Sequence, residues 1–443
     1  MRQALDVCQL SSLNVFRNDF YHYLKSYPDT LFELVESVLT NPGPVGSLPL
    51  LSLNPVFQRK HSSLYRSLAD GRFSQPDFED LLFEASPIEC PLVFGIDTTT
   101  YPRVQAKTGA ERGYTYQPVV GGHLLNPGYT YSWLSQLFLT PDSWTRPLSV
   151  RRLNPLENRS GQTIVQIKDF LARLPAIASP LLVFDAGYQT QSLARGLADT
   201  NAQTLVRVRH DRIGYRSARP RRAKQLGRTK LYGRKLAFGK LSTLPAPDEI
   251  LEDSKNEQPI LVKAWHQVLL KTTTPTTSVV AGSMITIQRG GRAEAAWRLF
   301  WTGPVETKPD LALIWQAYAH RFDLEHNFRF TKQTLAWTKP KLKTPQQIDL
   351  WTKLFVVAQS QLRLAKPLVA DYRLPWQSPL PSAKLTPGRV RQSFSRLVYL
   401  LVRPTTRPKL VKPGLGNKLG QKYQPRARYP VLKRPKPGPI LLL

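Results

Sequence analysis

The sequence PLVFGID, residues 91–97, is a short apolar run that ends in an aspartate. Such a run predicts a strand that is buried on both faces of a sheet. A second run of the same kind, PLLVFDAGY at residues 180–188, also places an aspartate where its apolar stretch stops. A carboxylate at the end of a buried strand is well placed to face a cleft at the sheet edge. The two stretches predict an α/β fold and make Asp97 and Asp185 candidate site residues.

The segments around these strands predict a mixed sheet with flanking helices. We expect strands at 116–123 and 130–140, joined by a turn at Asn126-Pro127-Gly128, because that tripeptide is typical of turns. Three more elements complete this α/β region: helices at 162–174 and 189–198, and a strand at 203–209.

Helical periodicity also marks the two ends of this region. Residues 10–40 predict helices, with Asp29 as an N-cap, and residues 60–85 predict two short helices with a break near Asp70-Gly71. The basic stretch 58–68 could enter a DNA groove or be a plain surface helix. A long helix is expected at 308–335, followed by another at 346–365.

Changes in composition divide the chain into five expected regions. The first is a helical N-terminal domain that could bind DNA ends, and a core follows in two parts separated by an insertion. The insertion is basic and β-rich, with a polar first half and β-like patches from 258 to 302. The C-terminal region is basic and Pro-rich, and much of 404–443 is expected to be extended or disordered. The N-terminal domain is expected at 1–90, the two parts of the core at 91–210 and 304–370, the insertion at 211–303 and the C-terminal region at 371–443.

The net charge of the chain indicates a polyanionic partner. It has 62 Lys and Arg against 31 Asp and Glu, a formal charge of +31 and a pI of about 10.3. Residues 1–90 are acidic, whereas 207–240 hold thirteen basic residues and one acid, and 403–436 hold eleven basic residues and no acid. Nucleic acid is the first candidate partner and an anionic membrane the second. The alternative for each basic run is a solvated loop or tail.

Several protein classes lack their usual signals in this sequence. No apolar run of 18 or more residues predicts a membrane span, and the N-terminus has no secretory signal. The two cysteines, Cys8 and Cys90, predict neither a disulfide framework nor a zinc site. There is no P-loop, no H-E-x-x-H and no G-x-S-x-G motif. We therefore expect a cytoplasmic protein.

Four polar residues share one stripe of the helix expected at 308–335. Tyr318, Arg321, Glu325 and Lys332 fall at roughly 0°, 300°, 340° and 320° around a helix with 100° per residue. One carboxylate, two cations and a phenol suit a site that holds a metal and a phosphate together. The alternative is a surface ion pair between Arg321 and Glu325, worth about 0.3–0.5 kcal/mol.

Glu325 can join the two strand-end aspartates as a third carboxylate. Magnesium prefers oxygen ligands, and phosphoryl transfer on nucleic acid commonly uses two ions about 3.5–4 Å apart. Asp97 and Asp185 on adjacent strands, with Glu325 on a helix packed against the sheet, would supply such a site. The alternative for each aspartate is a turn-forming role.

These motifs resemble those of a known family. The three acids in this order, with a β-rich insertion before the third, look like the RNase H-like core of DDE transposases. The pattern Y-x2-R-x3-E-x6-K over 318–332 is similar to the Tyr-Arg-Glu-Lys signature of bacterial insertion-sequence transposases. DAGY at 185–188 and GIDTT at 95–99 resemble that group's two aspartate motifs, although Thr98 stands where many members have a second Asp. The resemblance extends over about 91–370.

The resemblance implies a chemistry and a set of partners. Asp97, Asp185 and Glu325 would be catalytic and would bind two Mg²⁺ ions, for which Mn²⁺ could substitute. The activity would be DNA cleavage and strand transfer at terminal inverted repeats, by cut-and-paste transposition. A homodimer would act on paired transposon ends and on target DNA, associated with the bacterial nucleoid.

The resemblance also implies contacts to DNA. Tyr318, Arg321 and Lys332 would hold phosphates near the transposon end. A flipped base at a hairpin would stack on an aromatic of the insertion, for which the candidates are Trp265, Trp297 and Trp301. A buried structural role is the alternative for these indoles. An RNase H-fold nuclease without strand transfer, an inactive DNA-binding derivative and a basic RNA-binding protein remain alternative functions.

Overall fold

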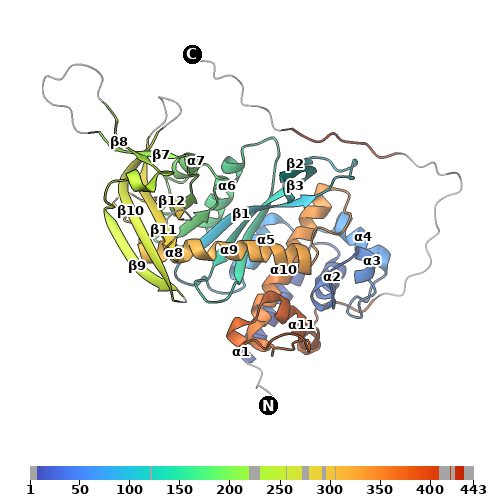
Figure 1. The fold of residues 1–443 in the computed structure, drawn as a ribbon. Coiled ribbons are helices and arrows are strands. Elements are labelled where there is room, and N and C mark those ends of the chain that lie inside the picture. The colour runs from blue at the N-terminus through green and yellow to red at the C-terminus, as the bar shows by residue number, and fades with distance from the viewer. Residues whose placement is uncertain are drawn as a thin grey trace, which may run out of the picture.

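The computed structural model describes residues 7–119, 122–218, 230–255, 257–271, 279–291, 296–304, 306–408, 420 and 425–433. In this part of the chain a mixed, largely antiparallel sheet of twelve strands is flanked by helices. Figure 1 shows the N-terminal helices at one end of the molecule and the strands of the 213–302 stretch at the other. No helix in the described ranges is long and apolar enough to cross a membrane.

The centre of the sheet is built around β1 (Val93–Pro102). β1 pairs in parallel with β5 (Leu181–Phe184), which pairs in parallel with β6 (Gln203–Arg207). On its other side β1 pairs antiparallel with β3 (Gly122–Leu137), and β3 pairs antiparallel with β4 (Thr145–Leu153). The apolar runs at 91–97, 180–188 and 203–209 are therefore strands, as predicted, and β4 is an additional strand.

The turn expected at Asn126-Pro127-Gly128 is wrong, because these residues lie inside β3. They pair with β2 (Gly113–Val119), and Pro127 stands opposite Tyr114. The Pro127 carbonyl accepts a hydrogen bond from the Arg103 amide at 2.7 Å. Pro127 lies just beyond the end of β1, so its missing N–H interrupts little of the ladder there.

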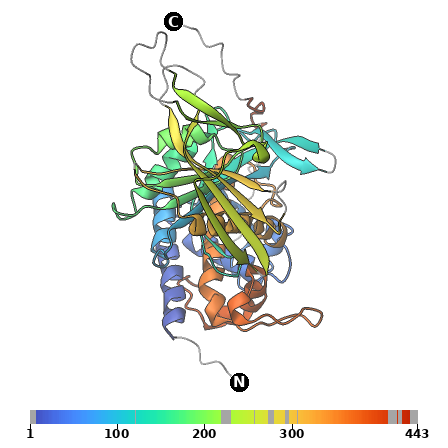
Figure 2. The same cartoon turned by 60° about the vertical axis from the view of Figure 1, so that its left-hand side comes forward.

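The sheet continues beyond β6 without a break. β12 (Trp297–Thr302) pairs antiparallel with β6, and β11 (Val280–Arg289) and β10 (Gln258–Leu270) follow in order. These three strands come to the front in Figure 2 and match the β-like patches of the sequence. The outermost strands fall in the stretch that is too polar for a core, and many of their side chains are exposed: β7 (Ile213–Ser217), β8 (Tyr232–Ala237) and β9 (Glu249–Lys255).

Side chains of alternating direction give the central strands two apolar faces. Phe94, Ile96 and Phe184 pack on one face against α6 (Arg159–Leu171) and α7 (Thr190–Gly196). Val93 and Val183 belong to the core on the other face, which includes side chains of three helices: α8 (Leu311–His320), α9 (Phe322–Arg329) and α10 (Pro345–Ala365). Asp97 and Asp185 continue the second alternation and so face the α9 side.

The predicted helix at 308–335 is continuous in direction but not uniform. Arg321 has helical backbone angles and joins α8 to α9, and residues Phe330–Thr334 form a π-helical turn. The Leu335 amide donates to the Phe330 carbonyl, as the wider π turn requires. The 100° per residue of an α-helix therefore does not apply beyond Arg329, and the position around the helix axis expected for Lys332 is wrong.

The N-terminal segment is helical as predicted, although the prediction of Asp29 as an N-cap is wrong. Its helices are α1 (Val7–Tyr23), α2 (Pro28–Thr40), α3 (Leu48–Leu51), α4 (His61–Asp70) and α5 (Gln75–Glu84). The N-cap of α2 is Tyr27, because Pro28 supplies the first helical turn and moves Asp29 inside the helix. The Asp29 carboxylate instead accepts hydrogen bonds from Tyr21 and Thr406.

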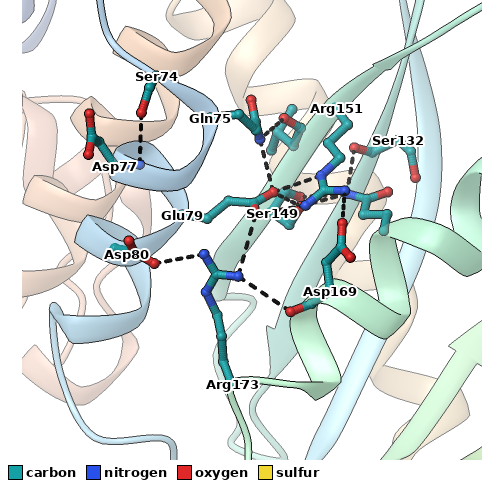
Figure 3. Close-up of polar contacts among 12 residues, drawn as sticks. Ser74, Gln75, Asp77, Glu79, Asp80, Ser132, Ser149, Arg151, Asp169 and Arg173 are labelled. Carbon is teal, nitrogen blue, oxygen red and sulfur yellow. Dashed lines mark hydrogen bonds and ion pairs between the residues drawn. The ribbon is translucent and has the colours of Figure 1, made fainter.

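A buried polar network fastens α5 to β4 and α6 (Figure 3). Glu79, 4% exposed, accepts hydrogen bonds from Ser149 at 2.5 Å, from Gln75 at 2.9 Å and from two nitrogens of Arg151 at 2.8 and 2.9 Å. Arg151 also binds Asp169, and Arg173 binds Asp80. We call Gln75, Glu79, Ser149, Arg151 and Arg173 the Glu79 cluster. It ties the N-terminal helices to the sheet.

The C-terminal part is described only in pieces. It contains α11 (Pro387–Leu397) and the segment 425–433, in which Leu432 forms a parallel bridge with Gly113. The middle of the basic run 207–240 and most of the run 403–436 lie outside the described residues, as does most of the expected extended tail.

Candidate active site

Asp97 and Asp185 lie side by side at neighbouring positions of two parallel strands. The register pairs Ile96 with Phe184, so each aspartate is the next residue along its own strand direction. Each carboxylate accepts a hydrogen bond from the following amide, Thr98 N–H at 2.7 Å and Ala186 N–H at 2.6 Å. These local bonds fix both side chains at the end of the β1–β5 pairing.

A close contact between sheet and helix brings Glu325 to the same place. Gly95 has no side chain, and a Cβ there would lie 2.7 Å from Leu324 Cδ1 of α9. α9 can therefore pack directly on β1, with Leu324 fully buried between them. Glu325, the next residue, lies at the rim of this contact with 47% of its side chain exposed.

Arg321 occupies the space between two of the three carboxylates. Its Nη2 donates to Glu325 Oε1 at 2.8 Å, and its Nη1 lies 3.5 Å from Asp97 Oδ2. The Arg321 side chain is only 3% exposed. The ion pair expected on the helix is thus real, but Arg321 is buried and faces the sheet, so the surface alternative is wrong for it.

The pKa of Asp97 shows that the three acids act on one another. This pKa is raised from 3.8 to about 6, chiefly by burial and also by the charges of Asp185 and Glu325. The Thr98 amide and the Arg321 guanidinium act in the opposite direction. For Arg321, burial alone would lower the pKa, but Tyr318, Glu325 and the two aspartates raise it overall. The site is a cation set among mutually repelling carboxylates.

The remaining residues of the predicted stripe also surround this cation. Tyr318 is fully buried, and its hydroxyl finds no partner of ordinary geometry among the described residues. Burial raises the Tyr318 pKa, opposed by Arg321. Burial lowers the pKa of Lys332, and the negative charge of Asp97 acts in the opposite direction. The structure brings Tyr318, Arg321, Glu325 and Lys332 together with both aspartates.

The donor types of this site fit a divalent cation. Carboxylate oxygens are the ligands that magnesium prefers. As the side chains stand, however, no three His, Cys, Asp or Glu residues in the described ranges lie close enough together to hold one metal ion. The Arg321 guanidinium is the cation that Asp97 and Glu325 face, so a metal would have to replace it there.

The three candidate tryptophans are buried. Trp265 and Trp301 are 3% and 4% exposed, and their indole N–H groups donate to the Pro245 carbonyl and to Gln203. Trp297 is 8% exposed and packs edge-on against Tyr318, with 4.9 Å between the ring centres. None offers a free ring face in this structure.

One contact at the site has no signal in the sequence. The Arg289 guanidinium lies 4.0 Å from the centre of the Trp297 ring and covers it. Arg289 is on β11 and Trp297 on β12, so their meeting depends on the pairing of these two strands. Local composition does not reveal which strands pair. Only if the β11–β12 pairing had been known could an arginine on one strand and a tryptophan on the other have indicated the contact.

Comparison with protein families adds an independent result. The family model described as "DDE superfamily endonuclease" matches residues 19–275, which is more than half of the chain. The match contains Asp97 and Asp185 and ends before α8 and α9, so Glu325 lies outside it. A search of curated proteins gave no match.

Proposed function

The chain belongs to the DDE superfamily endonucleases, and on that premise we propose that it is a transposase that cleaves and transfers DNA strands at the terminal inverted repeats of an insertion sequence. The family supports DNA cleavage by a transposase-like protein. The observation that carries the fuller proposal is the meeting of Asp97, Asp185 and Glu325 around Arg321, within the Tyr-Arg-Glu-Lys pattern.

The topology supports an RNase H-like core for this proposal. The strand order β4-β3-β1-β5-β6, with β1, β5 and β6 parallel and β3 antiparallel, is what such a core requires. We propose that residues 91–210 and 304–370 form it and that 211–303 are the insertion. Residues 1–90 would then be a helical domain that binds DNA ends, and 371–443 a basic C-terminal region.

We propose that Asp97, Asp185 and Glu325 hold two Mg²⁺ ions, with Mn²⁺ able to substitute. When bound, the ions would activate water or a 3′-hydroxyl and stabilise the leaving oxygen. The chain's own contribution is positional: the Thr98 and Ala186 amides hold the aspartates, and the Gly95 contact sets the depth of α9.

We propose that Tyr318, Arg321 and Lys332 bind phosphates of the cleaved strand. Arg321 bonds to Glu325 and lies beside Asp97, and both Arg321 and Tyr318 have buried polar atoms without a hydrogen bond among the described residues. Of the three tryptophans, Trp297 is the best candidate for stacking a flipped base, because it contacts Tyr318 and one of the side chains over its ring is the exposed Arg289. A homodimer acting on paired transposon ends and on target DNA completes the proposal.

The test uses the DNA that flanks the gene. The full chain is incubated with that DNA and Mg²⁺, and nicks, hairpins and joined products are separated on denaturing gels. We expect cleavage and strand joining, and Asp185→Asn should abolish both while end binding persists. The matched control is Asp199→Asn, an exposed carboxylate paired only with Lys168 among the described residues.

Other outcomes separate the alternatives. Cleavage without joining would favour an RNase H-fold nuclease. Binding without cleavage by the unaltered chain would favour an inactive derivative. Magnesium-dependent cleavage that persists in Asp185→Asn would refute the proposed role of the three acids.

A further inference from the structure

The Arg321 head group is buried with most of its hydrogen-bonding capacity unused. An arginine carries several N–H donors in a planar fork. Here Nη2 binds Glu325, while Nε and Nη1 find no hydrogen-bond partner among the described residues. A buried donor without a partner costs free energy, so such groups are usually matched by an acceptor. Nη1 has only the Asp97 carboxylate at 3.5 Å, so an anionic ligand could supply the acceptors that the described residues do not.

A second donor beside Arg321 is in the same condition. The buried Tyr318 hydroxyl has no hydrogen-bond partner of ordinary geometry in the described part of the chain, and the Arg321 guanidinium lies 5.7 Å from the centre of the Tyr318 ring. A single anionic group with several oxygens could accept from both side chains. A phosphate has this chemistry, and arginine binds it in a bidentate manner.

The partners of Arg321 differ in their freedom to move. Asp97 is held by the Thr98 amide and is 18% exposed in its side chain. Asp185 is held by the Ala186 amide. Glu325 is 47% exposed, and Arg321 is its hydrogen-bond partner among the described residues. Glu325 is therefore the carboxylate that can change position.

We propose that Arg321 gates the metal site: without DNA it holds Glu325, and a DNA phosphate that binds Arg321 and Tyr318 releases Glu325 to join Asp97 and Asp185. This inference rests on the proposed function. A guanidinium and a divalent ion cannot share the space between Asp97 and Glu325, so they compete for it. The phosphate stabilises the displaced guanidinium, and metal binding then becomes dependent on the substrate.

Coupling of this kind is reciprocal by thermodynamic linkage. If a DNA duplex raises the metal affinity by some factor, the metal must raise the duplex affinity by the same factor. The gate would keep the carboxylates from assembling a complete metal site away from a bound DNA end.

The experiment measures Mn²⁺ binding rather than activity. Free Mn²⁺ is followed by electron paramagnetic resonance during titration of the full chain, with and without a duplex carrying the element's end sequence. The sites of interest are those lost in Asp185→Asn, which removes Mn²⁺ bound by the DNA itself from consideration. We expect the duplex to tighten these sites at least about tenfold, within the usual range of such couplings.

Arg321→Gln should remove the gate. We expect it to bind Mn²⁺ without DNA about as tightly as the unaltered chain does with DNA, and to show no further response to the duplex. Arg329→Gln is the matched control, because it makes the same change at an exposed position of α9 and should keep the coupling. Unaltered Mn²⁺ affinity in a folded Arg321→Gln would overturn the gate.

A measurement on the unaltered chain tests the gate even if Arg321→Gln fails to fold. Duplex affinity is measured by fluorescence anisotropy with and without Mn²⁺, and the same factor of at least about ten is expected. If Mn²⁺ leaves the duplex affinity unchanged while Asp185→Asn still abolishes Mn²⁺ binding, the gate is overturned and the proposed metal site is not. Mn²⁺ binding that Asp185→Asn never alters would overturn the gate together with the proposed metal site.

Discussion

Two buried carboxylate–arginine clusters of this molecule differ in how completely they are bonded. In the Glu79 cluster, Glu79 accepts from Ser149, Gln75 and Arg151, and Arg151 uses a further donor on Asp169. At the candidate active site, Arg321 makes one hydrogen bond to Glu325, and Nε and Nη1 make none to the described residues, although Nη1 lies 3.5 Å from Asp97. In both clusters, removing charged groups from water costs free energy. Only in the Glu79 cluster do hydrogen bonds to all the buried charged groups offset that cost.

The pKa values of the two clusters move in opposite directions. Burial would raise the pKa of Glu79, but the hydrogen bonds from Arg151, Ser149 and Gln75 lower it overall. The pKa of Asp97 is raised to about 6, chiefly by burial, because the Thr98 amide and the Arg321 guanidinium do not offset it. A cluster whose hydrogen bonds are all made stabilises the fold, whereas a cluster with unused hydrogen-bond donors can bind a ligand.

The largest expected effect separates the two clusters by activity. Glu325→Gln should lower the cleavage rate by about a thousandfold, because metal-held charge supplies several kcal/mol of transition-state stabilisation. Glu79→Gln, measured well below its unfolding temperature, should leave the rate per folded molecule unchanged. Gel-based cleavage kinetics check both, and equal losses would remove the distinction between the clusters.

The next effect is on stability, and here Glu79 should dominate. Glu79→Gln leaves Arg151 and Arg173 facing a neutral group, and we expect it to lower the free energy of unfolding by about 3 kcal/mol. Denaturant unfolding followed by tryptophan fluorescence measures this change. A loss below about 0.5 kcal/mol would show that the cluster does not hold the N-terminal helices.

Asp97→Asn should have the opposite sign. The folded-state pKa of Asp97 lies above its unfolded value of 3.8, so the folded state binds more protons between about pH 4 and pH 6. The contribution of Asp97 to stability therefore falls as pH rises through that window, and the ionised carboxylate destabilises the fold above it. Without divalent ions at pH 7.5, Asp97→Asn should raise the free energy of unfolding by about 2 kcal/mol.

The pH dependence of the two clusters gives a control for this prediction. The folded-state pKa of Glu79 is lowered, so its contribution is present above the unfolded value of 4.5 and is lost as pH falls through the lowered folded value. Unfolding curves from pH 3 to pH 8 should show the Glu79→Gln deficit shrinking towards acid pH. The Asp97→Asn gain should shrink over the same range, and a gain independent of pH would contradict its electrostatic origin.

The smallest expected effect concerns DNA affinity. Lys332→Ala should weaken binding of any duplex by about tenfold and reduce the salt slope by about 0.9, the loss of one phosphate contact. Arg173→Ala, which removes a cation from the Glu79 cluster, should change neither quantity. Anisotropy titrations at several salt concentrations check the pair, and an unchanged slope in Lys332→Ala would place Lys332 away from DNA.

The sequence predicts the elements whose signals are local. The apolar runs that became β1 and β5 end in aspartates, and the parallel pairing of these strands brings the two acids together. α10 begins with a complete capping box at Thr344 and Gln347, close to its predicted start. Arg321 and Glu325 share a helical face by spacing alone.

Long-range partners explain what the sequence does not reveal. β4 reads TRPLSVRRL, and its three arginines interrupt the apolar pattern that marks the other strands of the core. Arg146 is 3% exposed because its guanidinium donates hydrogen bonds to four backbone carbonyls, those of Leu82, Phe83, Ser86 and Pro87. Arg151 is covered because it forms an ion pair with Glu79. The burial of Arg321 likewise depends on α9 resting on Gly95. Such pairings join residues far apart in the chain, so periodicity cannot show them.

The unbroken sheet from β5 to β8 has a mechanical consequence. β6 and β12 are joined by backbone pairing, so β8 is held to Asp185 through a continuous ladder. The exposed Arg234 and Lys235 lie on β8. The continuous backbone pairing therefore fixes the position of these two cations relative to the strands that carry Asp97 and Asp185.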